Sequence, residues 1–355
     1  MTRNKKIFVL DGIAGVPLGR EITAAFQEIG VEAVHFDCLR QKTRSLYGVR
    51  SACAKAANKR TDRDGFYFLP RLIENDLNDR LEGEQPSDIL VVGFAYKFFS
   101  PQFLKQAAAR CGARLFLYDT DSCNLYSRRR EFIFFVENEL PIYDRVFSFS
   151  QVTTRFFRDT RGLDAVHLPF GANPVQLPTS ESTIEALFVG SGDLRRIFLL
   201  ERIREHVSIY GNRWERHRAL ISQPLQARIV DIPVWGETLH KLLASSRIIL
   251  NITRSDFFGA ETGINLRIFE ALGAGRMLLT DYCEEIEDLF EIGTDIDVFR
   301  SSRELAEKVE YYLHNDDARD RIARNGQEKF LRQHTWASRI RQLSTHLWRD
   351  CESCA

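Results

Sequence analysis

The sequence has no excess of either charge and no long apolar run. Its 49 lysine and arginine residues balance 49 aspartate and glutamate residues, so it lacks the overall positive field of a nucleic-acid-binding protein. No run of about 18 apolar residues predicts a membrane-spanning helix, and the N-terminal apolar run is shorter than that of a signal peptide. We therefore expect a cytoplasmic protein that binds no nucleic acid, and we leave open peripheral contact with the inner membrane surface.

The sequence also lacks the spacings of disulfide and metal sites. Its seven cysteines are odd in number and scattered, which indicates reduced thiols. Only CESC, residues 351–354, has metal-like spacing, and a lone pair at a chain end is more typical of a frayed tail. The eight histidines form neither H-x3-H nor H-E-x-x-H, and there is no G-x-S-x-G motif and no P-loop. We expect no metal and no other cofactor.

Short apolar runs alternate with helical patterns along the chain, a rhythm that predicts βαβ units and parallel sheets. The stretch PFGANPVQLPTSEST interrupts this rhythm and is typical of a linker. We therefore expect an N-terminal domain at 1–172, a linker at 173–183 and a C-terminal domain at 184–334. The predicted strands span residues 6–10, 32–36, 88–93, 114–119, 145–150, 165–169, 184–190, 206–211, 247–252, 276–281 and 295–299. The predicted helices include residues 18–29, 71–81, 101–110, 301–313, 316–333 and 335–348.

The stretch GAETGINLRIFEALGAGRMLLTDY places charges in an otherwise apolar helix. If the helix starts near Asn265, then Gly263, Arg267 and Glu270 share one face. A surface ion pair at i, i+3 is one interpretation. The other is a ligand site, because the helix starts at the carboxyl edge of a predicted sheet, where its N–H groups favour phosphate. Gly263 would allow close approach, and the Glu270 carboxylate can accept two hydrogen bonds from a ribose diol. Together these groups describe a nucleotide.

Seven pieces of the second half carry a family resemblance. In order they are ALFVGSGDLRR, VSIYGNRW, LASSRIILNI, GINLRIFEALGAGRMLLTDY, EDLFEIG, SSRELAEKVEYYL and HTWASR. With them, residues 184–340 resemble the C-terminal half of group 1 glycosyltransferases of the GT-B fold, and within that group the spore-maturation CgeB-type glycosyltransferases. The resemblance implies an α/β protein with two doubly wound, Rossmann-like domains facing a central cleft. The N-terminal domain would bind the acceptor and the C-terminal domain a nucleotide sugar, and the C-terminal helix at 335–355 would pack back on the N-terminal domain.

The resemblance also implies roles for single residues. The group binds its donor with a Glu-x7-Glu motif whose second glutamate holds the ribose, and Glu270 matches it. The first glutamate, which contacts the sugar, is replaced by Thr262, with Glu261 one place off. In the group, a basic residue near the first strand of the second half holds the diphosphate, and Arg195 and Arg196 stand at that place. The alternative is that both are solvated surface arginines. The predicted donor-binding residues are Gly190, Arg196, Arg254, Thr262, Gly263, Ile264, Asn265 and Glu270, and the predicted catalytic residues are Arg195, Arg267 and Asp121.

Two turns of the N-terminal half are expected on the acceptor side. Gly12 and Gly15 leave the first strand-to-helix turn without side chains at two positions, and the resemblance places that turn near the acceptor. Asp119 and Asp121 follow a strand in YDTDS and can orient an acceptor hydroxyl or cap a helix. Asp-x-Asp is also the spacing with which transferases of another fold bind a divalent cation. We expect arginines and a helix N-terminus to meet the diphosphate charge instead, so that no metal is needed.

The sequence thus predicts a metal-independent glycosyltransferase that uses a nucleoside-diphosphate sugar, and the family resemblance implies that transfer retains the anomeric configuration. Its acceptor is unspecified and is a glycan, a lipid-linked molecule, a protein or a small molecule; the oligomeric state is also unspecified. Two rivals stay open: a GT-B-type nucleotide-sugar epimerase, and a noncatalytic GT-B-like nucleotide-binding or scaffold protein. Product analysis with a panel of donors separates the first, and nucleotide binding without turnover would indicate the second.

Overall fold

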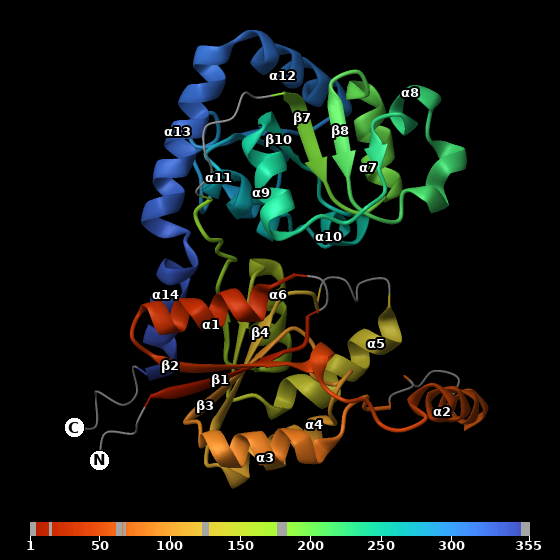
Figure 1. The fold of residues 1–355 in the computed structure, drawn as a ribbon, viewed down its shortest axis with the longest axis vertical. Coiled ribbons are helices and arrows are strands. Elements are labelled where there is room, and N and C mark those ends of the chain that lie inside the picture. The colour runs from red at the N-terminus through yellow and green to blue at the C-terminus, as the bar shows by residue number, and fades with distance from the viewer. Residues whose placement is uncertain are drawn as a thin grey trace. The chain divides into compact units, whose positions relative to one another are not determined.

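The computed structural model describes residues 5–13, 16–61, 66, 69–122, 128–175 and 183–348, without the side chains of residues 59–61. The chain divides into two compact units, Met1–Leu168 with Ile340–Ala355, and Pro169–Arg339, and each contains one sheet (Figure 1). The strands are β1 (Lys6–Asp11), β2 (Glu32–Asp37), β3 (Asp88–Val92), β4 (Arg114–Asp119), β5 (Arg145–Ser148), β6 (Ala165–His167), β7 (Ile184–Val189), β8 (Val207–Tyr210), β9 (Ile229–Val230), β10 (Ser246–Asn251), β11 (Met277–Asp281) and β12 (Asp297–Phe299). The α-helices are α1 (Leu18–Glu28), α2 (Tyr47–Thr61), α3 (Glu74–Glu84), α4 (Pro101–Arg110), α5 (Arg129–Phe134), α6 (Gln151–Arg155), α7 (Leu194–Leu200), α8 (Gln223–Gln226), α9 (Gly236–Ala244), α10 (Ser255–Gly259), α11 (Leu266–Gly273), α12 (Ser302–His314), α13 (Asp316–Gln333) and α14 (Trp336–Trp348).

The first sheet has six strands in the order β2-β1-β3-β4-β5-β6, and all neighbouring pairs are parallel. Every residue of β3 is buried, as expected for a parallel sheet covered on both faces. Helix α1 lies on one face and α3 and α4 lie on the other (Figure 1). The chain passes from β1 outward to β2 and then returns to the other side of β1 with β3. Ligands of doubly wound sheets bind at such a switch point, beyond the carboxyl ends of the strands.

The second sheet also has six parallel strands, in the order β12-β11-β10-β7-β8-β9. Here the chain fills one side of β7 with β8 and β9, and then crosses to the other side with β10. The order therefore reverses between β7 and β10, which makes the loops after these two strands the expected ligand edge of this unit.

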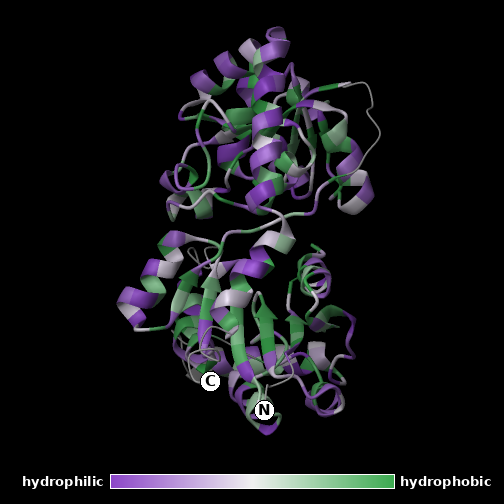
Figure 2. Ribbon diagram, turned by 90° about the vertical axis from the view of Figure 1, so that its left-hand side faces the viewer, coloured by the Kyte–Doolittle hydropathy of each residue, from purple (hydrophilic) through white to green (hydrophobic). Residues whose placement is uncertain are grey.

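Each unit has its own hydrophobic core between its sheet and its helices. In Figure 2 the strands of both sheets are mostly hydrophobic, whereas the helices carry hydrophobic and hydrophilic residues in alternation. Helix α11 is the most apolar example near the ligand edge, because Ile268, Phe269, Ala271 and Leu272 are all buried. Arg267 and Glu270 form the narrow polar face that the sequence predicted.

The last helix begins in the second unit and ends in the first. Trp336, at its start, is 1% exposed. At its other end the indole Nε1 of Trp348 donates a hydrogen bond to Asp88 Oδ2 at 3.0 Å, and its ring lies 6.5 Å from that of Phe26. The buried Asp88 carboxylate also pairs with Arg114 Nε at 2.8 Å, so α14 ends on a satisfied polar group inside the first unit.

Most predicted elements are confirmed to within a residue or two, and the prediction of two doubly wound α/β halves is confirmed. The helix predicted at 71–81 is wrong at its start, because α3 begins at Glu74. Leu72 instead forms an antiparallel bridge with Thr43, and Ile73 has an extended backbone. Helix α2 and strand β9 were not among the predicted elements. Residues 176–182 of the predicted linker lie outside the described residues.

Candidate functional site

The carboxyl edge of the second sheet is tied together by Asp193, which follows β7. Its side chain caps α7 by accepting a hydrogen bond from Arg195 N at 2.9 Å. It also accepts one at 2.8 Å from the hydroxyl of Ser255, at the start of α10. These bonds join the loops after β7 and β10, so the switch point is a built structure rather than two independent loops.

Arg195 occupies this switch point with part of its guanidinium available. Its Nη1 donates to Thr253 O at 2.8 Å and to Asp281 Oδ2 at 2.6 Å, and its charge lies 3.8 Å from the centre of the Phe258 ring. Asp281 also accepts from the backbone and hydroxyl of Thr253, each at 2.9 Å. The Arg195 side chain is 22% exposed, and within the described residues Nη2 has no hydrogen-bond partner. It is therefore held in place and still able to donate to an anion.

Arg196 has a different environment from its neighbour. Its Nε donates to Ile252 O and its Nη1 to Ser191 O, at 2.8 and 2.9 Å, and the residue is 8% exposed. Burial, followed by the charge of Arg254, lowers the pKa of Arg196 to about 9. The side chain holds two loop carbonyls together, so a contact with the donor would require breaking these bonds. Its donor-binding role stays a prediction, as does that of the half-buried Arg254.

The loop before α11 is positioned by its own polar groups. Asn265 caps the helix by accepting from Arg267 N at 3.0 Å, and its amide donates to Asn251 Oδ1 at 2.8 Å. The Thr262 hydroxyl donates to Glu285 Oε2 at 2.9 Å and is buried. Ile264 is fully buried, so only its backbone could reach a ligand. The first N–H groups of α11 thus stand at the edge of the sheet, as the sequence predicted.

Glycines at this edge serve contacts within the protein. A Cβ on Gly263 would lie 2.9 Å from Cys283 Sγ, and one on Gly190 would lie 2.8 Å from the Phe188 ring. Gly211 has φ +151°, and a Cβ there would lie 1.9 Å from Gly190 O. Trp214 is 1% exposed and donates from Nε1 to Gly190 O at 3.0 Å. Close packing of two loops explains these glycines without a ligand.

The polar face of α11 brings Arg267 and Glu270 together. Nη1 of Arg267 lies 2.6 Å from Glu270 Oε2, and the side chains are 12% and 18% exposed. The orientation gives Nη1 no hydrogen bond, and within the described residues the buried Nε also has none. Burial raises the pKa of Glu270, while the charges of Arg267 and His240 oppose the shift. No described residue donates a hydrogen bond to the Glu270 carboxylate, so both side chains have unused hydrogen-bonding capacity in a partly buried place.

The residues predicted on the acceptor side lie in the first unit. Gly12 donates to Val92 O at 3.0 Å, and a Cβ on it would lie 2.8 Å from Phe94 O. Gly15 lies outside the described residues. Asp119 is buried and accepts from the hydroxyls of Ser122 and Ser148 at 2.6 and 2.8 Å; its burial raises its pKa.

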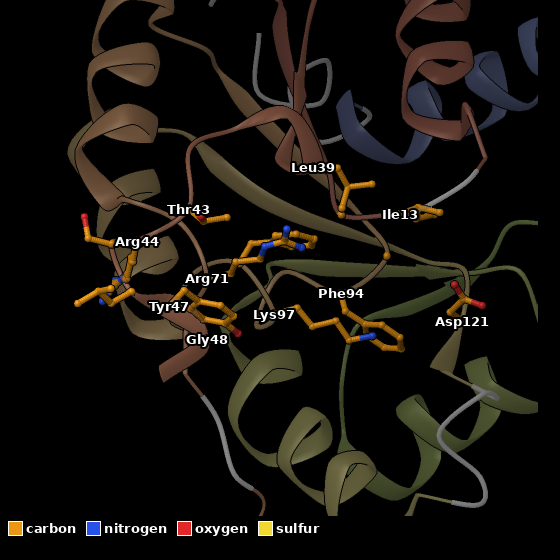
Figure 3. Close-up of a pocket in the computed structure, with 15 residues that line it drawn as sticks. Ile13, Leu39, Thr43, Arg44, Tyr47, Gly48, Arg71, Phe94, Lys97 and Asp121 are labelled. Atoms are coloured by element: carbon orange, nitrogen blue, oxygen red, sulfur yellow. The ribbon is translucent and has the colours of Figure 1, made fainter. Parts of the chain in front are cut away.

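Asp121 differs from Asp119 because it lines an open space. It faces a cavity of about 900 Å³ at the switch point of the first sheet (Figure 3). The structure thus brings Gly12 and Asp121 to one cavity, and it places Asp119 behind them as a support for the Asp121 loop. The roles of all three in binding an acceptor stay predictions.

Three contributors to these edges were not found from the sequence. Asp281, which orients Arg195, ends β11 and could have been found as an acid at a strand terminus. His240 is in α9 and affects Glu270 from an element distant in sequence. Arg71 lines the cavity of the first unit, but the sequence assigned it to a helix.

The described residues include neither a candidate metal cluster nor a helix that could cross a membrane. Among them, no group of three or more histidine, cysteine, aspartate or glutamate side chains could hold a metal ion. No described helix combines the length and the apolar character needed to cross a membrane. The CESC segment lies outside the described residues.

Comparison with known proteins bears on both units. Residues 195–345 match the model of a family described as glycosyl transferase-like. HepE of Anabaena, solved in complex with UDP and glucose, has a TM-score of 0.62 and 14% identity, over 97% of this chain and 99% of its own. The sucrose-phosphate synthase of Thermosynechococcus elongatus has a TM-score of 0.63 and 12% identity, over 99% and 100%. The fold is GT-B.

A third GT-B likeness shows why the fold does not by itself give an activity. The N-terminal domain of the Candida albicans trehalose-6-phosphate phosphatase has a TM-score of 0.62 and 10% identity, over 98% of this chain and 97% of its own. The sequence matches no curated protein. Any assignment of activity to this GT-B protein must therefore be argued from its own site.

Proposed function

We propose that this GT-B protein is a glycosyltransferase that takes a sugar from a nucleoside-diphosphate sugar bound at the carboxyl edge of its second sheet. The observation that carries the proposal is the Arg267–Glu270 pair, which is partly buried at the ligand edge and has hydrogen-bonding groups that no described residue satisfies. The family match over residues 195–345 and the UDP bound in the HepE structure support it. The resemblance to the CgeB-type branch is part of the same proposal.

In this site the Glu270 carboxylate accepts hydrogen bonds from the ribose diol. The N–H groups at the start of α11 and the free side of the Arg195 guanidinium meet the diphosphate. The bond from the anomeric carbon to the diphosphate oxygen breaks with its electron pair going to the diphosphate. The acceptor oxygen bonds to that carbon, and its proton passes to the departing diphosphate oxygen. Positive groups around the leaving diphosphate stabilise the charge that develops on it.

Further parts of the proposal concern outcome and setting. The transfer needs no metal, because cationic side chains and helix N–H groups supply the charge that a cation would supply. The resemblance to group 1 glycosyltransferases implies that the transfer retains the anomeric configuration. The described cysteines, Cys38, Cys53, Cys111 and Cys283, are free thiols, which supports a reducing compartment such as the cytoplasm. Contact with the inner membrane surface remains the alternative setting for an acceptor carried by a lipid.

Nucleotide binding followed by product analysis tests the proposal. The protein is heated with UDP, GDP, ADP, UDP-glucose and related donors, and a ligand at a hundred times its dissociation constant adds about 2.7 kcal/mol of stability. Donors that bind are then incubated with mixed acceptors and the products are identified. Transfer of the sugar supports the proposal, and isomerised sugar without an acceptor indicates an epimerase. Binding without any turnover indicates a binding protein, and failure to bind any nucleotide contradicts the site.

A further inference from the structure

The cavity of the first unit lies at the switch point of its sheet. Gly12 and Ile13 line it from the loop after β1, Gly93 and Phe94 from the loop after β3, and Asp121 from the loop after β4. The order reverses between β1 and β3, where doubly wound sheets bind ligands, and β4 is the strand next to β3. A volume of about 900 Å³ is enough for a drug-sized molecule.

The opposite wall is the segment from Thr43 to Gly48, and Arg44 anchors it. Its Nε donates to Leu72 O at 2.8 Å and its Nη2 to Glu74 Oε1 at 2.9 Å. The bridge between Thr43 and Leu72 holds the same two segments together. Arg44 therefore has a carboxylate partner and a structural role, although it lines the cavity.

Within the described part of the chain, Arg71 has no such partner. It precedes the bridge residue Leu72, so its guanidinium lies at the cavity rather than on α3. Among the described residues its side chain makes no hydrogen bond and no ion pair. Figure 3 shows it between the Thr43–Gly48 segment and Asp121. A half-buried guanidinium with all its donors unused is a ready partner for an anion.

Lys97 is a second cation at the cavity, and the nearest carboxylate that it meets lies at the limit of an ion pair. Its Nζ lies 4.4 Å from the centre of the Phe94 ring and 4.0 Å from Glu131 Oε1. That carboxylate already accepts from the Tyr96 hydroxyl and from Arg128 Nη1. The Lys97 side chain is 43% exposed, and its partial burial lowers its pKa against the opposing effects of Glu131 and Asp121. A ligand that supplied a negative charge here would favour the charged form of Lys97.

We propose that this cavity binds an acceptor through an anionic group, a phosphate or a carboxylate, that Arg71 and Lys97 hold. This inference rests on the proposed transferase function and names the class of its second substrate. The anionic group lies at the two cations, a hydroxyl of the same molecule lies toward Asp121, and Ile13, Leu39 and Phe94 contact its apolar part.

The test uses phenyl phosphate as the probe and benzyl alcohol as its neutral counterpart. Binding to the full chain is measured by ligand-observed NMR and calorimetry, in the presence of saturating UDP so that the second unit is occupied. The variants are Arg71→Met and Lys97→Met. Arg110→Met is the matched control, because α4 ends at Arg110 on the amino edge of the same sheet.

Wild type and Arg110→Met are expected to bind phenyl phosphate at least tenfold more tightly than either cavity variant. Benzyl alcohol should bind all four proteins alike, and their UDP affinity should be equal. Equal phenyl phosphate binding in all four proteins, or no binding to the wild type, would overturn the inference. Phenyl phosphate binding is also measured without UDP, and UDP affinity is measured separately. Wild type that binds phenyl phosphate but no UDP would contradict the donor site and not the anionic site.

A vesicle experiment separates two sources of the anion. Wild type and Arg71→Met are floated with vesicles of phosphatidylglycerol in phosphatidylcholine and with vesicles of phosphatidylcholine alone. Flotation that needs both phosphatidylglycerol and Arg71 assigns the anion to a lipid headgroup. Phenyl phosphate binding without such flotation assigns it to a soluble acceptor.

Discussion

The substitution Glu270→Gln separates the two roles that the Arg267–Glu270 pair can have. Glutamine keeps the shape and one oxygen acceptor of glutamate but removes the charge that faces Arg267 at 2.6 Å. The side chains are 12% and 18% exposed, which lies between a surface pair and a buried one. We therefore expect the unfolding free energy to fall by roughly 1–3 kcal/mol, between the values for those two limits.

The expected effect on nucleotide affinity follows from the hydrogen bonds of the ribose. A hydrogen bond to a charged group contributes about 1.5–3 kcal/mol, and glutamine replaces at most one of the two with a neutral bond. The dissociation constant for UDP should therefore rise roughly 10- to 150-fold. Calorimetry with UDP and 2′-deoxy-UDP makes the measurement specific: the wild type should prefer UDP, and Glu270→Gln should lose most of that preference.

The control is Asp316→Asn, which removes another ion pair of 2.6 Å, to Arg247, in the same unit. Arg247 is the second residue of β10 and so lies at the amino edge of the sheet, away from the proposed site. Its UDP affinity should equal that of the wild type. A folded Glu270→Gln protein with unchanged UDP affinity, or with an unchanged preference over 2′-deoxy-UDP, would refute the assignment of the ribose to Glu270.

Three further outcomes are expected. Arg195→Met should lower the ratio of UDP to uridine affinity about tenfold or more, because the diphosphate loses a charged donor; equal ratios in calorimetry would remove Arg195 from the diphosphate. Excess chelator should leave UDP affinity and turnover unchanged, and Asp121→Ala should reduce turnover at unchanged UDP affinity; activity that needs added manganese would contradict this. Burial, then the charge of Arg339, lowers the pKa of His334 to about 3, so only the unfolded chain takes up its proton near pH 6. Between pH 7.5 and 5, the free energy of unfolding of the wild type in urea should therefore fall by about 2 kcal/mol more than that of His334→Asn. Equal changes in the two proteins would show that His334 is not held neutral.

The sheets could be predicted from the sequence because their strands are buried on both faces. Such strands are continuous apolar runs that any window detects, as in DILVV of β3, where every residue is buried. Helix α13 was predicted at its observed bounds, 316–333, since a polar turn precedes it and its acids stand in the first turn. These signals depend only on residues that are close in sequence, so they can be recognised without knowledge of the fold.

The contacts of single side chains at the site could not be predicted as well from the sequence. Arg195 and Arg196 are neighbours with equal claims in the sequence, but one helical step turns them to different surroundings. Arg195 reaches Asp281 at the end of β11, whereas Arg196 is buried against loop carbonyls. Arg71 was assigned to a helix because the bridge from Leu72 to Thr43 depends on residues that are far apart in sequence. Tertiary pairing of this kind overrides local propensity.

The Asp-Thr-Asp triplet at the end of β4 shows why a short motif needs its surroundings. A cation site of the Asp-x-Asp kind uses both carboxylates as oxygen ligands. Here Asp119 is 1% exposed and accepts hydrogen bonds from two hydroxyls and from the backbone N–H groups of Asp121 and Ser122. Withdrawing that carboxylate to a metal would leave buried donors without partners, at a cost of about 1–3 kcal/mol each. Asp121 lines the cavity, as do the cations Arg71 and Lys97, and that arrangement suits an anionic acceptor better than a divalent cation.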